Sequence, residues 1–192
     1  KSPMIADPLT LYDCSPISDG AAAVVITTAD KADRFQGKQV RVLGFGQASD
    51  SLALYQHDDL TTLPAARIAS ERAYKMAGLG PDEIDLAEVH DCFTIAEVIA
   101  SEDLGFFPAG EGGDAAKEGV TGRDGRIPIN PSGGLKAKGH PVGATGVSQI
   151  AEAAFQLRDQ AGERQIDGAN VALTHNVGGS GATCVVTILG RS

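Results

Sequence analysis

Apolar positions in this chain fall into two patterns, continuous short runs and longer stretches in which apolar residues recur every three or four positions. The continuous runs predict buried strands, and they cover 21–27, 40–46, 85–89, 170–175 and 183–189. The periodic stretches predict helices, and they cover 29–34, 62–76, 94–100 and 142–159. Because strands and helices alternate along most of the chain, the pattern predicts a mixed α/β fold.

The predicted helix 142–159 has an unusually wide apolar arc. Its polar residues follow one narrow stripe, at spacings of three and four, made of Gln149, Glu152, Gln156 and Asp159. Nearly every other position is apolar or small, which is typical of a helix buried on more than one side. One sheet covers only one side, so the pattern predicts a second covering layer from another domain or chain.

Two segments lack a regular pattern. Residues 1–20 contain Pro3, Pro8 and Pro16, which exclude a long helix, and we interpret them as an N-terminal segment leading into the domain. Residues 105–132 mix glycine with charged residues and predict an irregular surface excursion with room for one helical turn. The remaining length fits one domain spanning residues 1–192.

Composition narrows the classes of function. With 42% hydrophobic and 21% charged residues, the chain matches an ordinary globular protein, and no apolar run is long enough to span a bilayer. A net charge of −9 argues against nucleic acid or an anionic membrane as partner. No signal peptide opens the chain. Three cysteines without a CxxC pair indicate a reduced, cytoplasmic protein rather than a disulfide framework.

Candidate chemistry gathers at two motifs, His90-Asp91-Cys92-Phe93 and Gly139-His140-Pro141. His90 and Cys92 follow a predicted strand, at the edge of an α/β sheet where ligands bind. Pro141 and the Ala-rich run after it place His140 at a predicted helix N-terminus, which favours a thiolate or an oxyanion. Histidine beside cysteine suits thiol and acyl chemistry. The structural alternative is a core histidine beside a buried thiol, and we place Cys14 and Cys184 in that packing class.

Glycine-rich turns surround these motifs. The 176–181 link, between the last two predicted strands, either aims backbone N–H groups into a site, as an oxyanion hole requires, or forms only a flexible hairpin loop. The approach to His140 lacks the GxGxxG spacing after a strand and has no Walker lysine, so we exclude a nucleotide fingerprint.

Three motifs in order, 90–93, 130–146 and 175–181, resemble the C-terminal half of thiolases (acetyl-CoA acetyltransferases), closest to the sterol-carrier-protein type. Ser15–Ala23 also resembles the segment that opens this half. The likeness covers essentially the whole chain. It implies a thiolase-like half-domain, β-α-β-α-β-α-β-β, with a five-stranded mixed sheet, helices on both faces, and a similar N-terminal half as partner.

The resemblance also implies residue roles. His140 would activate a nucleophilic cysteine and help bind the thioester oxygen, and His90 would help to hold that oxygen. Gly178 would offer an N–H to the acyl-enzyme oxyanion. Asn176 stands where ordinary thiolases carry an acid/base cysteine, so Cys92 becomes the candidate acid/base. No metal or covalently bound cofactor is implied, and coenzyme A enters as a substrate.

The nucleophilic cysteine of the family, with most of the coenzyme A contacts, belongs to the N-terminal half. This chain therefore resembles half an enzyme, whether a fragment, a separate subunit or a cleavage product, and is expected to be inactive alone. The resemblance implies thiolysis of 3-oxoacyl-CoA or its reverse, Claisen condensation, in fatty acid metabolism, by a homo-oligomer. The alternatives are a thiolase-fold retro-aldolase on a bulky CoA ester and a non-catalytic assembly subunit.

Overall fold

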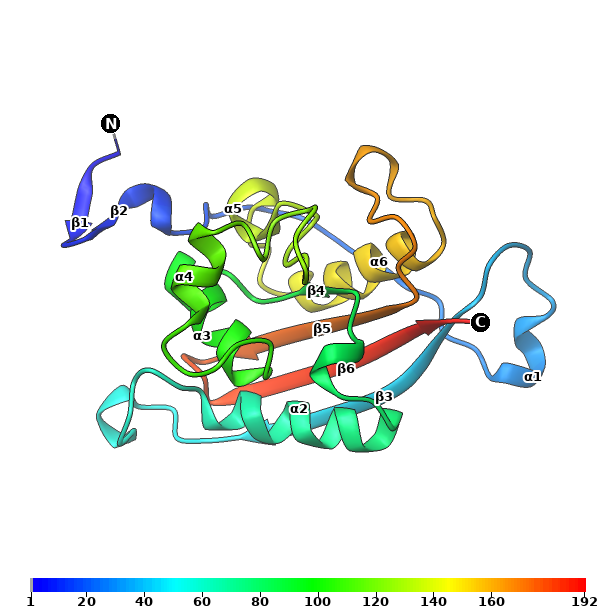
Figure 1. The fold of residues 1–192 in the computed structure, drawn as a ribbon, viewed down its shortest axis with the longest axis horizontal. Helices are drawn as coiled ribbons and strands as arrows, with labels where there is room; N and C mark the ends of the chain where they lie inside the picture. Colours follow the sequence, from blue (N-terminus) through cyan, green and yellow to red (C-terminus); the bar gives the residue numbers. More distant parts are fainter. Residues whose placement is uncertain (1) are drawn as a thin grey trace.

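A computed structural model describes residues 2–192, so Lys1, the first residue of the predicted N-terminal segment, lies outside the described residues. Four strands form one mixed sheet in the order β3-β6-β5-β4 (Figure 1). They are β3 (Val40–Ser49), β4 (Leu86–Glu88), β5 (Val171–Gly178) and β6 (Thr183–Arg191). β6 runs antiparallel to both β3 and β5, whereas β4 runs parallel to β5.

Helices cover both faces of this sheet, which confirms the predicted fold class (Figure 1). One face carries α2 and α3, and the other carries α6. The α-helices are α1 (Ala29–Ala32), α2 (Pro64–Ala77), α3 (Thr94–Asp103), α4 (Gly112–Lys117), α5 (Gly134–Lys138) and α6 (Thr145–Leu157). Short 3-10 helices occupy Leu11–Asp13, Leu54–Gln56, Pro81–Glu83 and Gly162–Arg164.

Small residues bring α2 unusually close to the sheet. The helix buries a row of alanines, including Ala69 and Ala73. The facing strand β3 presents Gly44 and Gly46, and a Cβ at either glycine would overlap the backbone carbonyl of Ala73 or Ala69. The helix therefore packs directly on the backbone of β3, and this close contact fixes the position of α2 on the sheet.

The prediction of a five-stranded sheet is wrong by one strand. Residues 21–27 adopt no regular structure, and Val25 and Ile26 are 86% and 80% exposed. A strand needs a hydrogen-bonded neighbour, and the described sheet ends at β3 and β4 without pairing this run. Apolar character alone therefore predicted a strand that finds no partner within residues 2–192.

The polar stripe of α6 faces inward. Gln149, Glu152 and Gln156 are buried against the sheet and the 162–166 loop, where each forms hydrogen bonds. The opposite face carries Val147 and Phe155, and Phe155 is 46% exposed. The sequence predicted burial on two sides, but in this structure the polar side is the covered one.

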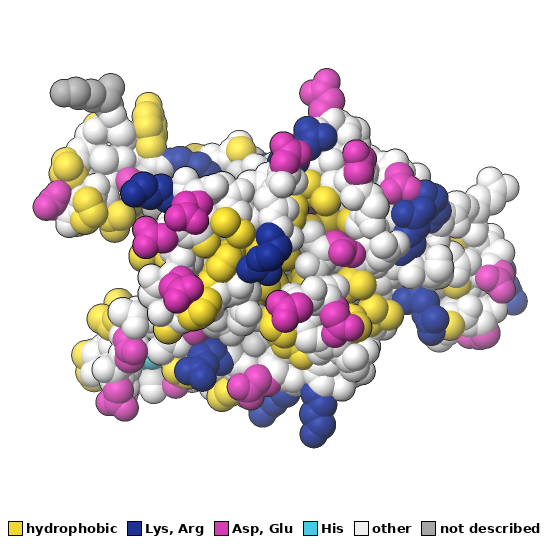
Figure 2. All heavy atoms as spheres, viewed as in Figure 1, with side chains coloured by type: hydrophobic (Ala, Val, Ile, Leu, Met, Phe, Trp, Pro, Cys, Tyr) yellow, Lys and Arg dark blue, Asp and Glu magenta, His cyan; other side chains and the backbone are white. Residues whose placement is uncertain are grey.

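The N-terminal segment and the 105–132 region contain short regular elements. Strands β1 (Met4–Ala6) and β2 (Leu9–Thr10) form a separate hairpin that extends from the domain (Figure 1). Figure 2 shows hydrophobic side chains on the surface of this lobe, at the upper left, where Met4, Ile5 and Tyr12 are more than half exposed. Within 105–132 only α4 is helical. No helix within residues 2–192 is long and apolar enough to cross a bilayer.

Candidate functional site

His90 lies directly beyond the end of β4, in a loop held by a side-chain clamp. The Val89 N–H donates to Asn130 Oδ1 at 2.8 Å, and Asn130 Nδ2 donates to Glu97 Oε2 at 2.7 Å. Asn130 adopts a left-handed backbone with φ 52°, which asparagine tolerates better than most residues. Burial raises the pKa of Glu97 to about 6. The clamp ties α3 to the end of the strand that delivers His90.

The two predicted histidines meet. The rings of His90 and His140 pack edge to face, with centroids 4.8 Å apart and an interplanar angle of 89°. His90 is only 8% exposed. Burial, with a smaller contribution from His140, lowers the pKa of His90 to about 4. His90 is therefore neutral near pH 7, when it can donate one hydrogen bond without carrying charge.

His140 does not lie at the N-terminus of a helix, contrary to the prediction. Helix α5, which the sequence did not reveal, ends at Lys138, and α6 begins only at Thr145, so Pro141 belongs to the intervening turn. Thr145 Oγ1 lies 2.7 Å from His140 Nδ1 and donates to the Pro141 carbonyl at 3.2 Å. A hydroxyl that donates there accepts from Nδ1–H, so the neutral form of His140 carries its lone pair on Nε2.

Asn176 joins this pair from β5. Its Nδ2 lies 3.2 Å from His90 Nδ1 and 3.1 Å from Gln149 Oε1. The contact spans 86 positions of sequence separation and could not be read from either motif alone. The 175–181 loop therefore reaches the histidines through an amide side chain.

Gly178, the other predicted loop residue, closes β5 and is exposed, with open space beside its Cα. The turn that follows contains Gly179 and Gly181 at positive φ. Its strands continue the sheet as the β5–β6 hairpin. The geometry leaves room for a ligand beside Gly178, and its oxyanion role stays a prediction.

Cys92 lies on the His90 loop, half-buried and with a free thiol. Burial and the neighbouring Asp91 raise the pKa of the thiol. A raised pKa favours the protonated form, so Cys92 in this environment is better prepared to give a proton than to hold a thiolate.

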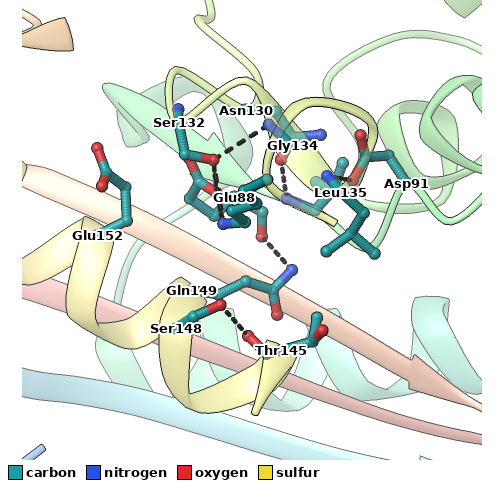
Figure 3. A network of polar contacts seen from close by, with 12 residues as sticks. Glu88, Asp91, Asn130, Ser132, Gly134, Leu135, Thr145, Ser148, Gln149 and Glu152 are labelled. Atoms are coloured by element: carbon teal, nitrogen blue, oxygen red, sulfur yellow. Dashed lines mark hydrogen bonds and ion pairs between the residues drawn. The ribbon is translucent and has the colours of Figure 1, made fainter. Parts of the chain in front are cut away.

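A buried carboxylate beneath the site escaped the sequence analysis. Glu88 is 1% exposed and its two oxygens accept from Ser132, from Oγ at 2.7 Å and from N–H at 3.0 Å, with Lys138 at 3.4 Å (Figure 3). Burial raises its pKa despite Lys138. Glu88 occupied an apolar strand pattern, and this lone charge at a buried position was the available signal.

Asp91 fastens the glycine-rich turn to the same loop. Its Oδ1 accepts from the Leu135 N–H at 2.8 Å (Figure 3). Gly134 has φ 63°, and a Cβ there would overlap the Asp91 carboxylate. The Gly133-Gly134 pair thus allows the 130–146 stretch to close over the His90 loop.

The N-terminal segment runs beside both motifs. The Ser15 N–H donates to the Cys92 carbonyl at 2.9 Å, and the His140 N–H donates to the Pro16 carbonyl at 3.4 Å. A Cβ at Gly139 would overlap Ser18. The segment therefore fixes the backbone next to Cys92 and His140.

Comparisons with known proteins point to one family. Residues 46–191 match the family model described as thiolase C-terminal domain-like. An acetyl-CoA acetyltransferase of Methanothermobacter thermautotrophicus is 54% identical over the whole chain, which covers 50% of that protein. Sterol carrier protein 2 of Rattus norvegicus is 40% identical over 96% of the chain, which covers 35% of that protein.

A solved structure gives the same architecture. The Ltp2-ChsH2(DUF35) aldolase superposes with a TM-score of 0.84 at 27% identity, over 98% of this chain and 49% of that one. The chain spans about half the length or less of the relatives it matches. Family model, relatives and fold agree, and the chain belongs to the thiolase C-terminal domain family.

Proposed function

We propose that the chain is the acid/base half of a thiolase-like acyltransferase that acts on 3-oxoacyl-CoA in the cytoplasm. The observation that carries the proposal is the His90–His140 pair, in which one ring is held by Asn176 and the other by Thr145. Two imidazole rings at such close range suit a thioester oxygen and a thiol proton better than they suit core packing.

The nucleophilic cysteine is assigned to an N-terminal half outside this chain. In cleavage, the thiol of that cysteine gives its proton to His140 and the resulting thiolate attacks C3 of the substrate. The C2–C3 bond breaks, and the departing acetyl-CoA carbanion takes the Cys92 proton. Cys92 thiolate then removes the proton of the incoming CoA thiol. The CoA thiolate attacks the acyl thioester and releases the nucleophilic cysteine, which recovers its proton from His140. The raised pKa of Cys92 supports its first role.

The uncovered apolar surfaces support the partner half. Residues 21–27 lack a strand neighbour, and the outer face of α6 exposes Phe155. Apolar side chains left exposed in this way favour association, where a partner covers them. We expect a complex with an N-terminal half, and higher oligomers of that unit. A stable monomer by light scattering at micromolar concentration, without binding of a hydrophobic dye, would contradict this expectation.

The main test is an assay of the isolated chain with acetoacetyl-CoA and CoA, before and after adding the N-terminal half of the Methanothermobacter relative. We expect activity only after the addition, because covalent catalysis needs a nucleophile held against its base, an arrangement worth about 7–11 kcal/mol. Activity of the chain alone would show that a nucleophile lies within these residues.

Cys92→Ser in the assembled enzyme separates the acid/base role from packing. We expect acyl transfer to the nucleophile to persist and turnover to fall by about 10²–10⁴-fold, because a hydroxyl is a much weaker acid and base. Cys184→Ser is the control, since Cys184 is buried in β6. Turnover within a factor of a few of the parent would return Cys92 to the packing class.

A retro-aldolase is the second candidate, because the similar solved structure is named an aldolase. Such an enzyme breaks a carbon–carbon bond without an acyl-cysteine. The same assembled protein, given a bulky 3-hydroxyacyl-CoA, distinguishes the two. Release of a ketone or aldehyde without CoA consumption would favour the aldolase, and CoA-dependent cleavage of acetoacetyl-CoA would favour the thiolase. If neither reaction occurs, the non-catalytic assembly subunit remains.

A further inference from the structure

A chain of side-chain amides leads from the middle of α6 to His90. Gln149 is 1% exposed, and its Nε2 donates to the His175 carbonyl at 3.0 Å and lies 3.4 Å from the Glu88 carbonyl. Its Oε1 lies 3.1 Å from Asn176 Nδ2, which in turn lies 3.2 Å from His90 Nδ1. Figure 3 shows the Gln149 amide directed from α6 toward the strand that carries Glu88.

The direction of every hydrogen bond in this chain follows from the two backbone carbonyls. A carbonyl only accepts, so the NH₂ group of Gln149 must face His175 and its oxygen must face Asn176. That oxygen also only accepts, so Asn176 must turn its own NH₂ group toward Gln149. The same NH₂ group has a second N–H, and this one points at His90 Nδ1.

His90 Nδ1 is therefore an acceptor. We propose that Gln149 and Asn176 are positioning residues that hold neutral His90 in the tautomer with its proton on Nε2. Under the proposed function, on which this step rests, His90 then presents an N–H to the thioester oxygen. The remaining ring nitrogen of His140 has a lone pair, so the two rings divide the tasks of donor and base.

The alternative is that Gln149 only satisfies two buried carbonyls. Gln156, two turns later on α6, provides the matched control, because it is 0% exposed and its Nε2 also donates to a backbone carbonyl, that of Arg164, at 2.8 Å. Its partners are Glu152, one turn earlier on α6, and the backbone of Arg164 and Ile166. A merely structural role predicts the same consequences for both glutamines, whereas the positioning role predicts that only Gln149 affects His90.

The experiment reads the tautomer directly. The chain is labelled with ¹⁵N-histidine, and long-range ¹H–¹⁵N NMR at pH 7 shows which ring nitrogen carries the proton, alone and after assembly with an unlabelled N-terminal half. Only four histidines need assignment. The variants are Gln149→Leu, Asn176→Asp and, as control, Gln156→Leu.

We expect the Nε2–H tautomer of His90 in the parent and in Gln156→Leu. Asn176→Asp should move the proton to Nδ1, because a carboxylate accepts where the amide donated. Gln149→Leu should give a mixture, because Asn176 loses the group that orients it. An Nδ1–H parent, or unchanged His90 signals in both site variants, would overturn the proposal, as would an equal change in Gln156→Leu.

The kinetic arm keeps this inference separate from the proposed function. In assembled enzyme, Asn176→Asp should lower kcat about 10²–10³-fold, as does loss of an oxyanion-hole donor. If the tautomers are as expected but the assembled protein has no thiolase activity, the positioning role of Gln149 and Asn176 is supported and the proposed function is contradicted. Full activity in Asn176→Asp with a shifted tautomer would remove the donor role of His90.

Discussion

The inward face of α6 combines polar residues with the fully buried Ala153 and Leu157, whereas the outward face is apolar. Its polar face, with Gln149, Glu152 and Gln156, is buried against the sheet and the 162–166 loop. The opposite face carries Val147 and Ala151, which are half-buried, and Phe155, which is 46% exposed. Polar groups can be buried when each finds a partner, whereas apolar surface gains nothing from water. The polar side chains therefore belong to the fold and the site, and under the proposed function we expect the apolar face to take part in assembly.

A charge on the apolar face gives the largest expected effect. Ala151→Glu should weaken association with the N-terminal half at least about 100-fold and abolish thiolase activity at micromolar concentration, because an unpaired charge is costly to bury. Gln160→Glu, which adds a charge at an exposed position beyond the helix, is the control. Activity assays and sedimentation of the mixture measure both effects. Normal assembly of Ala151→Glu would show that this face is free in the complete enzyme.

Acid should lower the free energy of unfolding through His175, the buried histidine whose carbonyl accepts from Gln149 on the polar face of α6. Burial, together with His90, lowers the pKa of His175 from 6.5 to about 3. The unfolded chain then binds a proton that the folded chain does not, so the contribution is intact above pH 6.5 and is lost as pH falls toward the folded pKa. Between pH 7 and 5 this costs about 2 kcal/mol for one such histidine.

His175→Gln tests this linkage by denaturant unfolding at both pH values. Raised carboxylate pKa values act in the opposite direction, Glu97 being the clearest case, so the total pH dependence is not the readout. The relevant quantity is the difference between parent and variant. If the free energy of unfolding changes equally with pH in both proteins, His175 is not held neutral by the fold.

Loss of an inward amide away from the site should cost less. Gln156→Leu leaves the Arg164 carbonyl and the Ile166 N–H without their partner. We expect a loss of about 1–3 kcal/mol in the free energy of unfolding, the penalty of buried unsatisfied polar groups. Urea unfolding of the isolated chain gives the value. If the substitution leaves stability unchanged or raises it, the hydrogen bonds of Gln156 do not contribute to the stability of the fold.

Sequence pattern predicted most of the framework and missed the orientation of this helix. The strand before His90 and the helix after Phe93 were read correctly, because each combines a clear apolar pattern with a turn. The sequence placed Gln149 on a polar stripe without showing that this stripe faces the sheet, since periodicity reports polarity and not hydrogen-bond partners. The carbonyls that Gln149 binds belong to Glu88 and His175, far away in sequence.

In the site too, local motifs could be recognised in the sequence, whereas contacts between residues far apart in the sequence could not. His90 and His140 were identified from their motifs, and the structure brings their rings together. Glu88 was missed, because a single acid inside an apolar strand signals burial without saying what surrounds it. Its partners Ser132 and Lys138 lie 44 and 50 positions away. The motifs identified the histidines of the site, whereas the groups that hold the surrounding loops in place become apparent only in the three-dimensional fold.

The smallest expected effect is also the sharpest test of the comparison. Phe155→Ser on the apolar face should lower the stability of the isolated chain by no more than about 1 kcal/mol, because a side chain that is 46% exposed loses only about half of the energy of full burial. The same substitution should still weaken assembly, where the ring would be covered. Unfolding and association are therefore measured on one variant. A stability loss as large as that of Gln156→Leu would mean that the two faces contribute alike to the fold, and that the outer face is not reserved for a partner.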